Sequence, residues 1–304
     1  MVKKTYDCII VGGGIAGLQA AIQLGRYDHD ILVVDSNDGR SAICRSYHNL
    51  LGWPEGVSGE QLRALGRQQA ESVGVEFQSD RIVTARKDKG EFILDGKEGY
   101  HYVGRKLLLA TGVMDNLPDI KNLLPCLGLS VYVCPDCDGY EVKNKKVVIL
   151  GSGEAGAEMA QTIQYWTDRI TFINHESKEV TDATRKKLEE RNIRLVEGDI
   201  SEAIVEGDSD FKGVLLDNGV EITGEKGFIA FGGNKVHTEL ARQLGVEILD
   251  NKHINADARS KETNVGDVWA AGDIVAHSEQ VSTAMGDGSI AAIWIHKKLL
   301  SEKN

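Results

Sequence analysis

Two glycine-rich turns constrain the fold of this 304-residue chain. The first, residues 12–17, follows the apolar run at 8–11, and the second, residues 151–156, follows the apolar run at 146–150. A helical pattern follows each turn. In a strand–turn–helix setting, glycines let the backbone approach a pyrophosphate at the N-terminus of the helix. The sequence therefore predicts two dinucleotide-binding folds.

The strands that follow each turn differ in how they end. Residues 31–34 form an apolar run that ends in Asp35, and an acidic residue about 20 positions after the turn accepts hydrogen bonds from a ribose hydroxyl. Residues 170–173, after the second turn, end in Asn-His-Glu at 174–176. The two patterns indicate two bound dinucleotides, or one dinucleotide and a second domain that has kept the fold without the ligand.

Other segments extend this plan. The predicted elements are a helix at 61–74, two or three short strands at 75–94, and a closing helix at 281–300. Residues 39–59 are rich in glycine and polar residues, which is typical of a loop that wraps a ligand or of a plain surface loop. Cys44 and His48 lie in this segment without a partner in the sequence, so neither is assigned a role.

Cys134 and Cys137 are separated by two residues and are followed at once by Asp138. Two thiols held one helical turn apart can close and reopen a disulfide, and the adjacent carboxylate can transfer the proton. The same spacing occurs in half of a zinc site, but the sequence has no second Cys-x-x-Cys and no His-x-His, and the other three cysteines stand singly. We therefore expect redox chemistry and no metal, in preference to two unrelated buried thiols.

Charge and composition exclude several kinds of partner. The formal net charge of −11 argues against nucleic acid or an anionic membrane surface as the main partner. No apolar run approaches the roughly 20 residues that cross a bilayer, and the N-terminal residues lead into a strand without a signal-peptide core. We expect a cytoplasmic protein, in which a cycling cysteine pair needs a source of electrons.

Taken in order, these motifs resemble the low-molecular-weight thioredoxin reductases of the pyridine nucleotide-disulfide oxidoreductase superfamily, over essentially the whole chain. The shared order is an FAD fingerprint, Ala-Thr-Gly at a strand end, Cys-x-x-Cys-Asp-Gly, a nicotinamide fingerprint and a late Gly-Asp. The resemblance implies an α/β chain with two Rossmann-like domains of the three-layer ββα/βα type. It places a discontinuous FAD domain at residues 1–114 and 235–304 and a nicotinamide-type domain with the cysteines at 115–234. It also implies a homodimer.

The resemblance also assigns site residues. Those expected to contact FAD are Gly12, Gly14, Ile15, Ala16, Gly17, Asp35, Ser36, Asn49, Ala110, Thr111, Gly112, Gly272, Asp273, Gln280 and Val281. Those expected to contact NADH or NADPH are Gly151, Gly153, Glu154, Ala155, Gly156 and Glu176. Cys137 would be the thiol nearest the flavin, Cys134 would exchange with the substrate, and Asp138 would act as the acid or base. Pro135 suits the first turn of a helix, whose N-terminus would lower the pKa of a cysteine.

Four features depart from the family pattern. Glu176 stands where those reductases carry arginines for the 2′-phosphate of NADPH, which favours NADH or an unused site. Gly-Arg-Ser at 39–41 replaces Gly-Gly-Gln, Pro-Asp at 135–136 replaces Ala-Thr, and Tyr-Glu at 140–141 follows the Asp-Gly. The last two features favour dithiol oxidases of natural products, whereas Asp138 argues against them because a His is common there.

The expected function is an FAD-dependent thiol–disulfide oxidoreductase. It would pass two electrons from a reduced donor through FAD to the Cys134–Cys137 disulfide and on to a disulfide substrate, either a thioredoxin-like protein or a small molecule. The donor would be NADH, NADPH, a reduced ferredoxin or another flavin. Two alternatives stay open: a dithiol oxidase that uses oxygen to form a disulfide in a small molecule, and a non-catalytic flavin redox sensor.

Overall fold

The computed structural model describes residues 4–302, which divide between two compact units. The first unit takes in the chain up to Ala42, Glu60–Met114 and the chain from Lys235 onward; the second takes in Ile43–Gly59 and Asp115–Asn234. Ile43–Gly59 thus packs with the second unit, whereas the prediction placed all of residues 1–114 in one domain. This segment packs in the second unit because Ile43 contacts the apolar core there and a backbone hydrogen bond of 3.3 Å joins the Arg45 amide to the Leu127 carbonyl.

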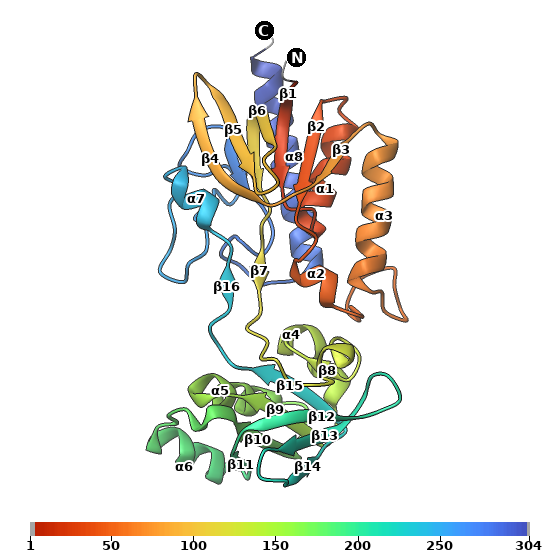
Figure 1. Ribbon diagram of the computed structural model, residues 1–304, viewed down its shortest axis with the longest axis vertical. Coiled ribbons are helices and arrows are strands. Elements are labelled where there is room, and N and C mark those ends of the chain that lie inside the picture. The colour runs from red at the N-terminus through yellow and green to blue at the C-terminus, as the bar shows by residue number, and fades with distance from the viewer. Residues whose placement is uncertain (1–3, 303–304) are drawn as a thin grey trace. The chain divides into compact units, whose positions relative to one another are not determined.

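The first unit is built on a seven-stranded sheet (Figure 1). Its parallel strands are β3 (Glu76–Ser79), β2 (Ile31–Asp35), β1 (Thr5–Val11), β6 (His101–Leu109) and β17 (Val268–Ala270). The antiparallel strands β5 (Glu91–Gly96) and β4 (Ile82–Asp88) continue from β6. β6 pairs with β5 through its first half and with β17 through its second half, so it joins the parallel and antiparallel parts.

Alternating side chains of β1 bury both faces of this sheet. Cys8 and Ile10 pack in the core formed with helices α1 (Ile15–Gly25) and α8 (Val281–Ser301). Ile9 and Val11 pack in a second core with β4, β5 and helix α7 (Glu239–Gln243). Successive side chains of a strand point to opposite faces of its sheet, so β1 contributes to both cores. The sheet is therefore the middle one of three layers.

The predicted helices are confirmed as α3 (Gly59–Ser72) and α8, and the strands predicted at 75–94 as β3, β4 and β5. The segment predicted as a loop at 39–59 begins with a short helix, α2 (Arg40–Ile43). Across residues 4–302, every helix is too short or too polar to pass through a lipid bilayer.

The second unit repeats the three-layer plan. Its parallel sheet consists, in order, of β11 (Arg194–Glu197), β10 (Ile170–Asn174), β9 (Val147–Gly151), β15 (Lys226–Ala230) and β8 (Val131–Tyr132). One face carries helices α5 (Gly153–Ile163) and α6 (Asp182–Glu190), and the other carries the antiparallel strands β12 (Ile200–Glu206), β13 (Asp210–Leu216) and β14 (Glu221–Thr223). The remaining short helices are η1 (Leu124–Cys126), α4 (Pro135–Asp138), η2 (Gly139–Val142) and η3 (His175–Ser177). The predicted α/β fold with two Rossmann-like sheets is confirmed.

Two short strands mark where the chain leaves and re-enters the first unit. β7 (Val113–Met114) and β16 (Lys235–Val236) pair antiparallel, with Met114 opposite Lys235 and Val113 opposite Val236. The two stretches of the first unit that flank residues 115–234 are therefore joined by backbone hydrogen bonds at the point where the second unit is inserted.

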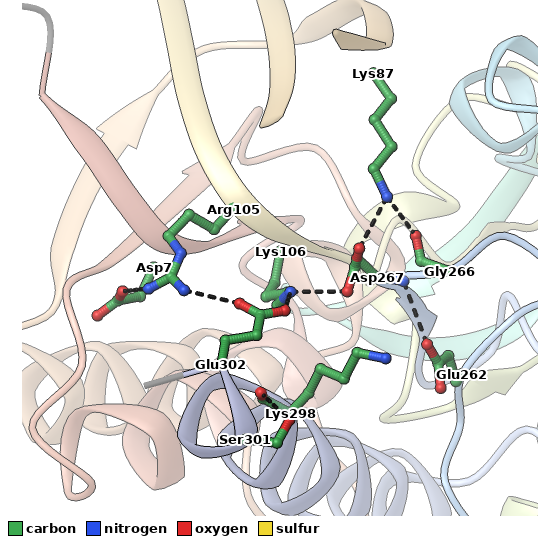
Figure 2. A network of polar contacts seen from close by, with 10 residues as sticks. All are labelled: Asp7, Lys87, Arg105, Lys106, Glu262, Gly266, Asp267, Lys298, Ser301 and Glu302. Carbon is green, nitrogen blue, oxygen red and sulfur yellow. Dashed lines mark hydrogen bonds and ion pairs between the residues drawn. The ribbon is translucent and has the colours of Figure 1, made fainter. Parts of the chain in front are cut away.

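A buried lysine joins distant parts of the first unit (Figure 2). The Lys106 side chain, 3% exposed, lies with Nζ 2.7 Å from Oδ1 of Asp267 and also pairs with the Glu302 carboxylate. Arg105 extends the network, since it pairs with Glu302 at 2.7 Å and with Asp7 at 3.1 Å. These ion pairs link β1, β6, the residue before β17 and the end of α8.

Replacing Lys106 with Met should lower the free energy of unfolding of the first unit by about 1.5–3 kcal/mol, because Asp267 and Glu302 lose a charged donor in a buried setting. The midpoint of urea unfolding, followed by circular dichroism, measures this change. The matched control is Lys186→Met, since Lys186 is 76% exposed and its ion pair with Glu190 is at the surface. Equal midpoints for the two variants would contradict a stabilising role for the network.

Candidate functional site

The cysteine pair lies on a short helix of the second unit and is closed as a disulfide. Cys134 and Cys137 are bonded through their sulfurs, with their Cα atoms 5.3 Å apart. Strand β8 leads to Cys134, the N-cap of α4, and Pro135 begins the helix without needing a backbone N–H. The Cys137 amide donates to the Cys134 carbonyl at 3.2 Å and lies 3.2 Å from the Cys134 sulfur. The same amide would stabilise a thiolate on Cys134 once the disulfide is reduced.

A glycine and a tryptophan fix the end of this helix. The Trp166 indole packs so closely on Gly139 that a Cβ at this position would overlap the ring. Tyr140, the next residue, is exposed. The glycine after Asp138 is therefore required by packing, which explains the Asp-Gly pair in physical terms.

Asp138 is a half-buried acid beside the disulfide in the sequence, and it has a basic neighbour. Its carboxyl, on a side chain 13% exposed, has Oδ1 3.5 Å from Nδ1 of His48. Burial raises the pKa of Asp138 to about 6, His48 acts in the opposite direction, and Glu141 adds to the rise. A carboxyl that titrates near neutral pH can both accept and donate a proton there.

His48 is held in place by the segment around it, although the sequence showed no partner for it. Tyr47 and Val57 exchange two backbone hydrogen bonds, of 2.8 and 3.1 Å, on either side of the turn that carries His48. The imidazole lies edge-on to the buried Tyr132 ring, with centroids 6.3 Å apart. His48 is thus a candidate site residue that sequence reasoning missed.

The other cysteines lie in different environments. Cys8 and Cys126 are buried, and burial raises the pKa of both thiols. The Cys44 thiol donates to the Ser46 carbonyl at 3.3 Å. Burial disfavours a thiolate at Cys8 and Cys126, so both suit packing better than exchange chemistry.

The first glycine-rich turn brings the end of one strand against its neighbour. A Cβ on Gly12, whose φ is +107°, would overlap the carbonyl oxygen of Ala110, and a Cβ on Gly17 would overlap the carbonyl of Gly12. Gly14 is the N-cap of α1, and Ile15 and Ala16 open the helix. A helix N-terminus capped by glycine leaves backbone N–H groups for an anion such as a diphosphate.

Asp35, at the end of β2, is paired with an arginine that the sequence did not identify. Its Oδ2 accepts from Nη2 of Arg63 at 2.6 Å, and Arg63 also contacts Asn37 and the Gly13 carbonyl. A cavity of about 160 Å³ opens here, lined by Gly13, Leu18, Asp35, Asn37, Arg63, Ala64, Arg67, Phe77, Gln78 and Ser79. Its acidic, basic and aromatic lining suits a ribose and a base. The expected Ser36 uses its hydroxyl on Asp38, at 2.5 Å.

The expected residues near the C-terminus gather around the end of β17. Asp273 lies 3.3 Å from Nη1 of Arg40, which also pairs with Glu279 at 2.5 Å. Arg40, the middle residue of the Gly-Arg-Ser departure, therefore contacts the segment that precedes α8. Gln280 is the N-cap of α8, and Val281 is its first residue.

A buried carboxylate secures the same segment. Asp287 accepts from the Gly272 amide at 3.3 Å and pairs with Nε2 of His277 at 2.7 Å and with Lys261 at 2.8 Å. Thr111, at the end of β6, donates its hydroxyl to the His237 carbonyl at 2.7 Å. Two backbone turns expected to face a cofactor are thus held by side chains of the first unit.

Of the residues expected to contact FAD, one lies in the other unit. Asn49 belongs to the second unit, whereas Gly12 to Ser36, Ala110 to Gly112 and Gly272 to Val281 belong to the first. The first unit thus brings together both glycine turns expected for the two halves of FAD, and its residues fit that group.

The second glycine-rich turn is already in contact with the segment that follows β10. The Gly153 amide, at the start of α5, donates to Oδ1 of the fully buried Asn174 at 2.8 Å. A Cβ on Gly153 would lie 3.1 Å from the Glu179 carbonyl, so the segment after β10 packs on this turn. Glu154 accepts from the Thr181 amide at 2.7 Å and from the Thr184 hydroxyl at 2.8 Å. One backbone amide that could meet a diphosphate, that of Gly153, is therefore already used.

In the rest of this site, the basic side chains of Lys178 and Arg185 are each already paired with an acid. Glu176 is exposed and pairs with Lys178 at 2.8 Å, and this hydrogen bond lowers the pKa of Glu176. Arg185 pairs with Glu197 at 2.7 Å. Ala155 and Gly156 lie in the first turn of α5, and a Cβ on Gly156 would overlap the Phe172 ring. These residues do not fit a 2′-phosphate.

Comparison with known proteins gives matches along nearly the whole chain. The family described as pyridine nucleotide-disulphide oxidoreductase matches residues 6–288. Thioredoxin reductase of Treponema pallidum (strain Nichols) is 30% identical over 301 residues, which is 95% of this chain and 96% of that protein. Thioredoxin reductase of Aquifex aeolicus (strain VF5) is 29% identical over 318 residues, covering 99% and 95%. The crystal structure of HlmI aligns with a TM-score of 0.86 and 28% identity, covering 98% of this chain and 94% of that chain.

The raised pKa of Asp138 predicts a pH-dependent gain of stability in the Asp138→Asn variant. The folded-state pKa, about 6, lies above the ordinary value, so the ionised carboxyl destabilises the fold above pH 6 and this cost fades as pH falls toward 4. The oxidised variant should be more stable than the wild type by about 2–3 kcal/mol at pH 8, and this difference should stay nearly constant until the pH reaches about 6 and then shrink down to pH 4. Urea unfolding across this range measures it.

The control for this measurement is Asp136→Asn, in the same helix, because the Asp136 side chain is exposed. A difference for Asp138→Asn that stays constant between pH 8 and pH 4 would show that the carboxyl does not titrate in this window.

Proposed function

Because the chain belongs to the pyridine nucleotide-disulphide oxidoreductase family, within its low-molecular-weight thioredoxin reductase-like group, we propose that it reduces a disulfide substrate through the Cys134–Cys137 pair. The family comprises flavin-dependent enzymes that use FAD and a nicotinamide nucleotide. The observation that carries the proposal is the disulfide on α4 followed by the half-buried acid Asp138.

Residues of the first unit would hold FAD. The N-terminus of α1 and Gly14 would bind the diphosphate, and Asp35 would accept hydrogen bonds from the ribose while Arg63 keeps its carboxylate oriented. Asp273, held by Arg40, would bind near the ribityl chain. When bound and reduced by the electron donor, the flavin would supply the two electrons that reduce the cysteine pair.

The second unit would carry out the exchange with the substrate. The Cys134 thiol loses its proton to Asp138, and the thiolate, stabilised by the Cys137 amide, attacks one sulfur of the substrate disulfide. The substrate S–S bond breaks, and the leaving sulfur takes the proton back from Asp138. Cys137 then attacks the sulfur of Cys134, which releases the second substrate thiol and restores the disulfide.

The partner would be a thioredoxin-like protein or a small disulfide in a reducing cytoplasm, and the protein would act as a homodimer. The relatives named thioredoxin reductase support a thioredoxin-like protein as the first substrate to test. The acidic surface implied by the net charge of −11 makes nucleic acid an unsuitable partner.

The Cys134→Ser variant should lose disulfide reduction by at least about a hundredfold, because the exchanging sulfur is gone. It should still purify yellow with about one FAD per chain, since the residues expected to bind FAD in the first unit are untouched. Turnover of an added disulfide with NADH or NADPH as the electron donor and the flavin absorbance measure the two properties. Cys44→Ser, which removes a cysteine outside the pair, is the control and should keep both.

Other results would favour the alternatives. Hydrogen peroxide release from an added dithiol, with no disulfide reduction, would indicate a dithiol oxidase. Wild-type turnover in Cys134→Ser would show that the pair is structural, and a colourless protein that cannot take up FAD would contradict the proposal as a whole.

The expected nicotinamide preference follows from Glu176, which lies just after β10. Selection of NADPH needs a cation against the 2′-phosphate, a contact worth about 1.5–3 kcal/mol, whereas Glu176 opposes that phosphate and the nearby Lys178 and Arg185 are already paired. Stopped-flow reduction of the flavin by NADH should therefore be as fast as by NADPH or faster. Glu176→Arg should raise the NADPH to NADH rate ratio about tenfold, and the exposed Glu189→Arg should leave it unchanged. Much faster reduction of the wild type by NADPH would refute this reading of Glu176.

A further inference from the structure

His48 reaches the cysteine helix from a segment that lies 90 residues earlier in the chain. The His48 side chain is 25% exposed, so solvent still reaches the ring, while the adjoining Asp138 side chain is only 13% exposed. An imidazole in this position joins a buried acid to water. Because imidazole gains and loses protons at neutral pH, this is an arrangement for moving protons as well as for packing.

The segment that carries His48 is fastened to the second unit by its backbone. The Arg45 amide donates to the Leu127 carbonyl at 3.3 Å, and the Arg45 guanidinium donates to the Pro125 carbonyl at 3.3 Å. A Cβ on Gly128 would lie 2.9 Å from the Ser46 amide nitrogen, so a glycine is needed where the two segments meet. His48 is therefore placed by a constrained backbone and not by its contact with Asp138 alone.

We propose that His48 is a positioning residue for thiol–disulfide exchange, which orients the Asp138 carboxyl and holds the second proton released by the cysteine pair. This inference rests on the proposed function of the Cys134–Cys137 disulfide. It assigns a role to a residue outside the Cys-x-x-Cys-Asp motif.

The exchange moves two protons, one after the other, through the same carboxyl. Oxidation of the reduced pair to the disulfide releases two thiol protons, and the two substrate sulfurs must each receive one. Asp138 gives its first proton to the first leaving sulfur and must then accept the proton of Cys137. Nδ1 of His48, 3.5 Å from Oδ1 of Asp138, can take this second proton from the carboxyl, hold it, and return it through the carboxyl to the second leaving thiolate.

The charges around Asp138 determine what loss of His48 would do. Glu141 of η2 and burial favour the protonated acid, whereas His48 favours the carboxylate. Nζ of Lys226, on β15, lies 3.2 Å from the Tyr132 hydroxyl, so this cation faces the ring on which His48 packs. Removing the imidazole leaves Glu141 and burial unopposed, so Asp138 would hold its proton to higher pH.

The test uses the full-length protein, reduced with dithiothreitol and freed of it, in single-turnover exchange with two disulfides. An aromatic disulfide such as 5,5′-dithiobis(2-nitrobenzoate) leaves as a stable thiolate, whereas hydroxyethyl disulfide needs a proton on its leaving sulfur. His48→Leu should slow the reaction with hydroxyethyl disulfide about tenfold and leave the aromatic disulfide nearly unaffected. His48→Asn keeps a donor in place of Nδ1 without titrating, and should recover part of the rate.

The pH dependence gives an independent readout. The part of the pH–rate profile for hydroxyethyl disulfide that depends on Asp138 should move to higher pH in His48→Leu. Carbon-13 NMR of the Asp138 carboxyl in the oxidised protein should show that its titration moves to higher pH as well. His101→Leu is the matched control, because His101 contacts Asp95 at 2.6 Å but is largely exposed in the first unit. It should leave both readouts unchanged.

Each outcome decides the matter. Equal slowing of both disulfides in His48→Leu would indicate a merely structural residue and overturn the proposal, as would unchanged rates. If the wild type exchanges with neither disulfide, the proposed function fails. The NMR titration then decides whether His48 acts on Asp138, and identical titrations in wild type and His48→Leu overturn that role as well.

Discussion

Close backbone approach at glycine is the constraint on which both units depend. In the first unit, a Cβ on Gly12 would overlap the carbonyl oxygen of Ala110, and in the second a Cβ on Gly151 would overlap that of Ala230. In each case the glycine that ends one parallel strand touches the end of its neighbour. This contact lets the chain turn sharply from strand to helix, so the two three-layer folds share one local cause.

The two turns differ in what their freed backbone groups do. The first turn lies beside a cavity with Asp35 and Arg63 in its lining, and its helix is capped by a glycine that has no side chain to occupy the N-terminus. At the second turn, Asn174 accepts from the Gly153 amide and the carbonyl of Glu179 packs on the same glycine. The same fold thus presents a helix N-terminus capped only by glycine in one unit, whereas in the other one amide of the turn is already bonded within the chain.

The sequence was sufficient to predict elements that depend on local patterns. The strand–turn–helix units and the closing helix follow from glycine spacing and apolar periodicity within short windows, and the cysteine helix from the Cys-x-x-Cys spacing and Pro135. The four-residue helix α2 was missed because it is too short to show a period. Arg63 and His48 were missed for another reason: each contacts an acid, 28 and 90 residues away respectively, and no local spacing records such a pairing.

The placement of residues 43–59 has a consequence for the chain as a set of modules. Since this segment belongs to the second unit, that unit is assembled from two separate stretches of the gene. A fragment encoding residues 115–234 would contain the disulfide, Asp138 and the complete parallel sheet, but it would lack His48 and the backbone that lies against Gly128. Recombination that exchanges this unit between relatives therefore has to transfer the segment between α2 and α3 along with residues 115–234. Because that segment is flanked on both sides by the first unit, one continuous exchange of both pieces would carry part of the first unit with it.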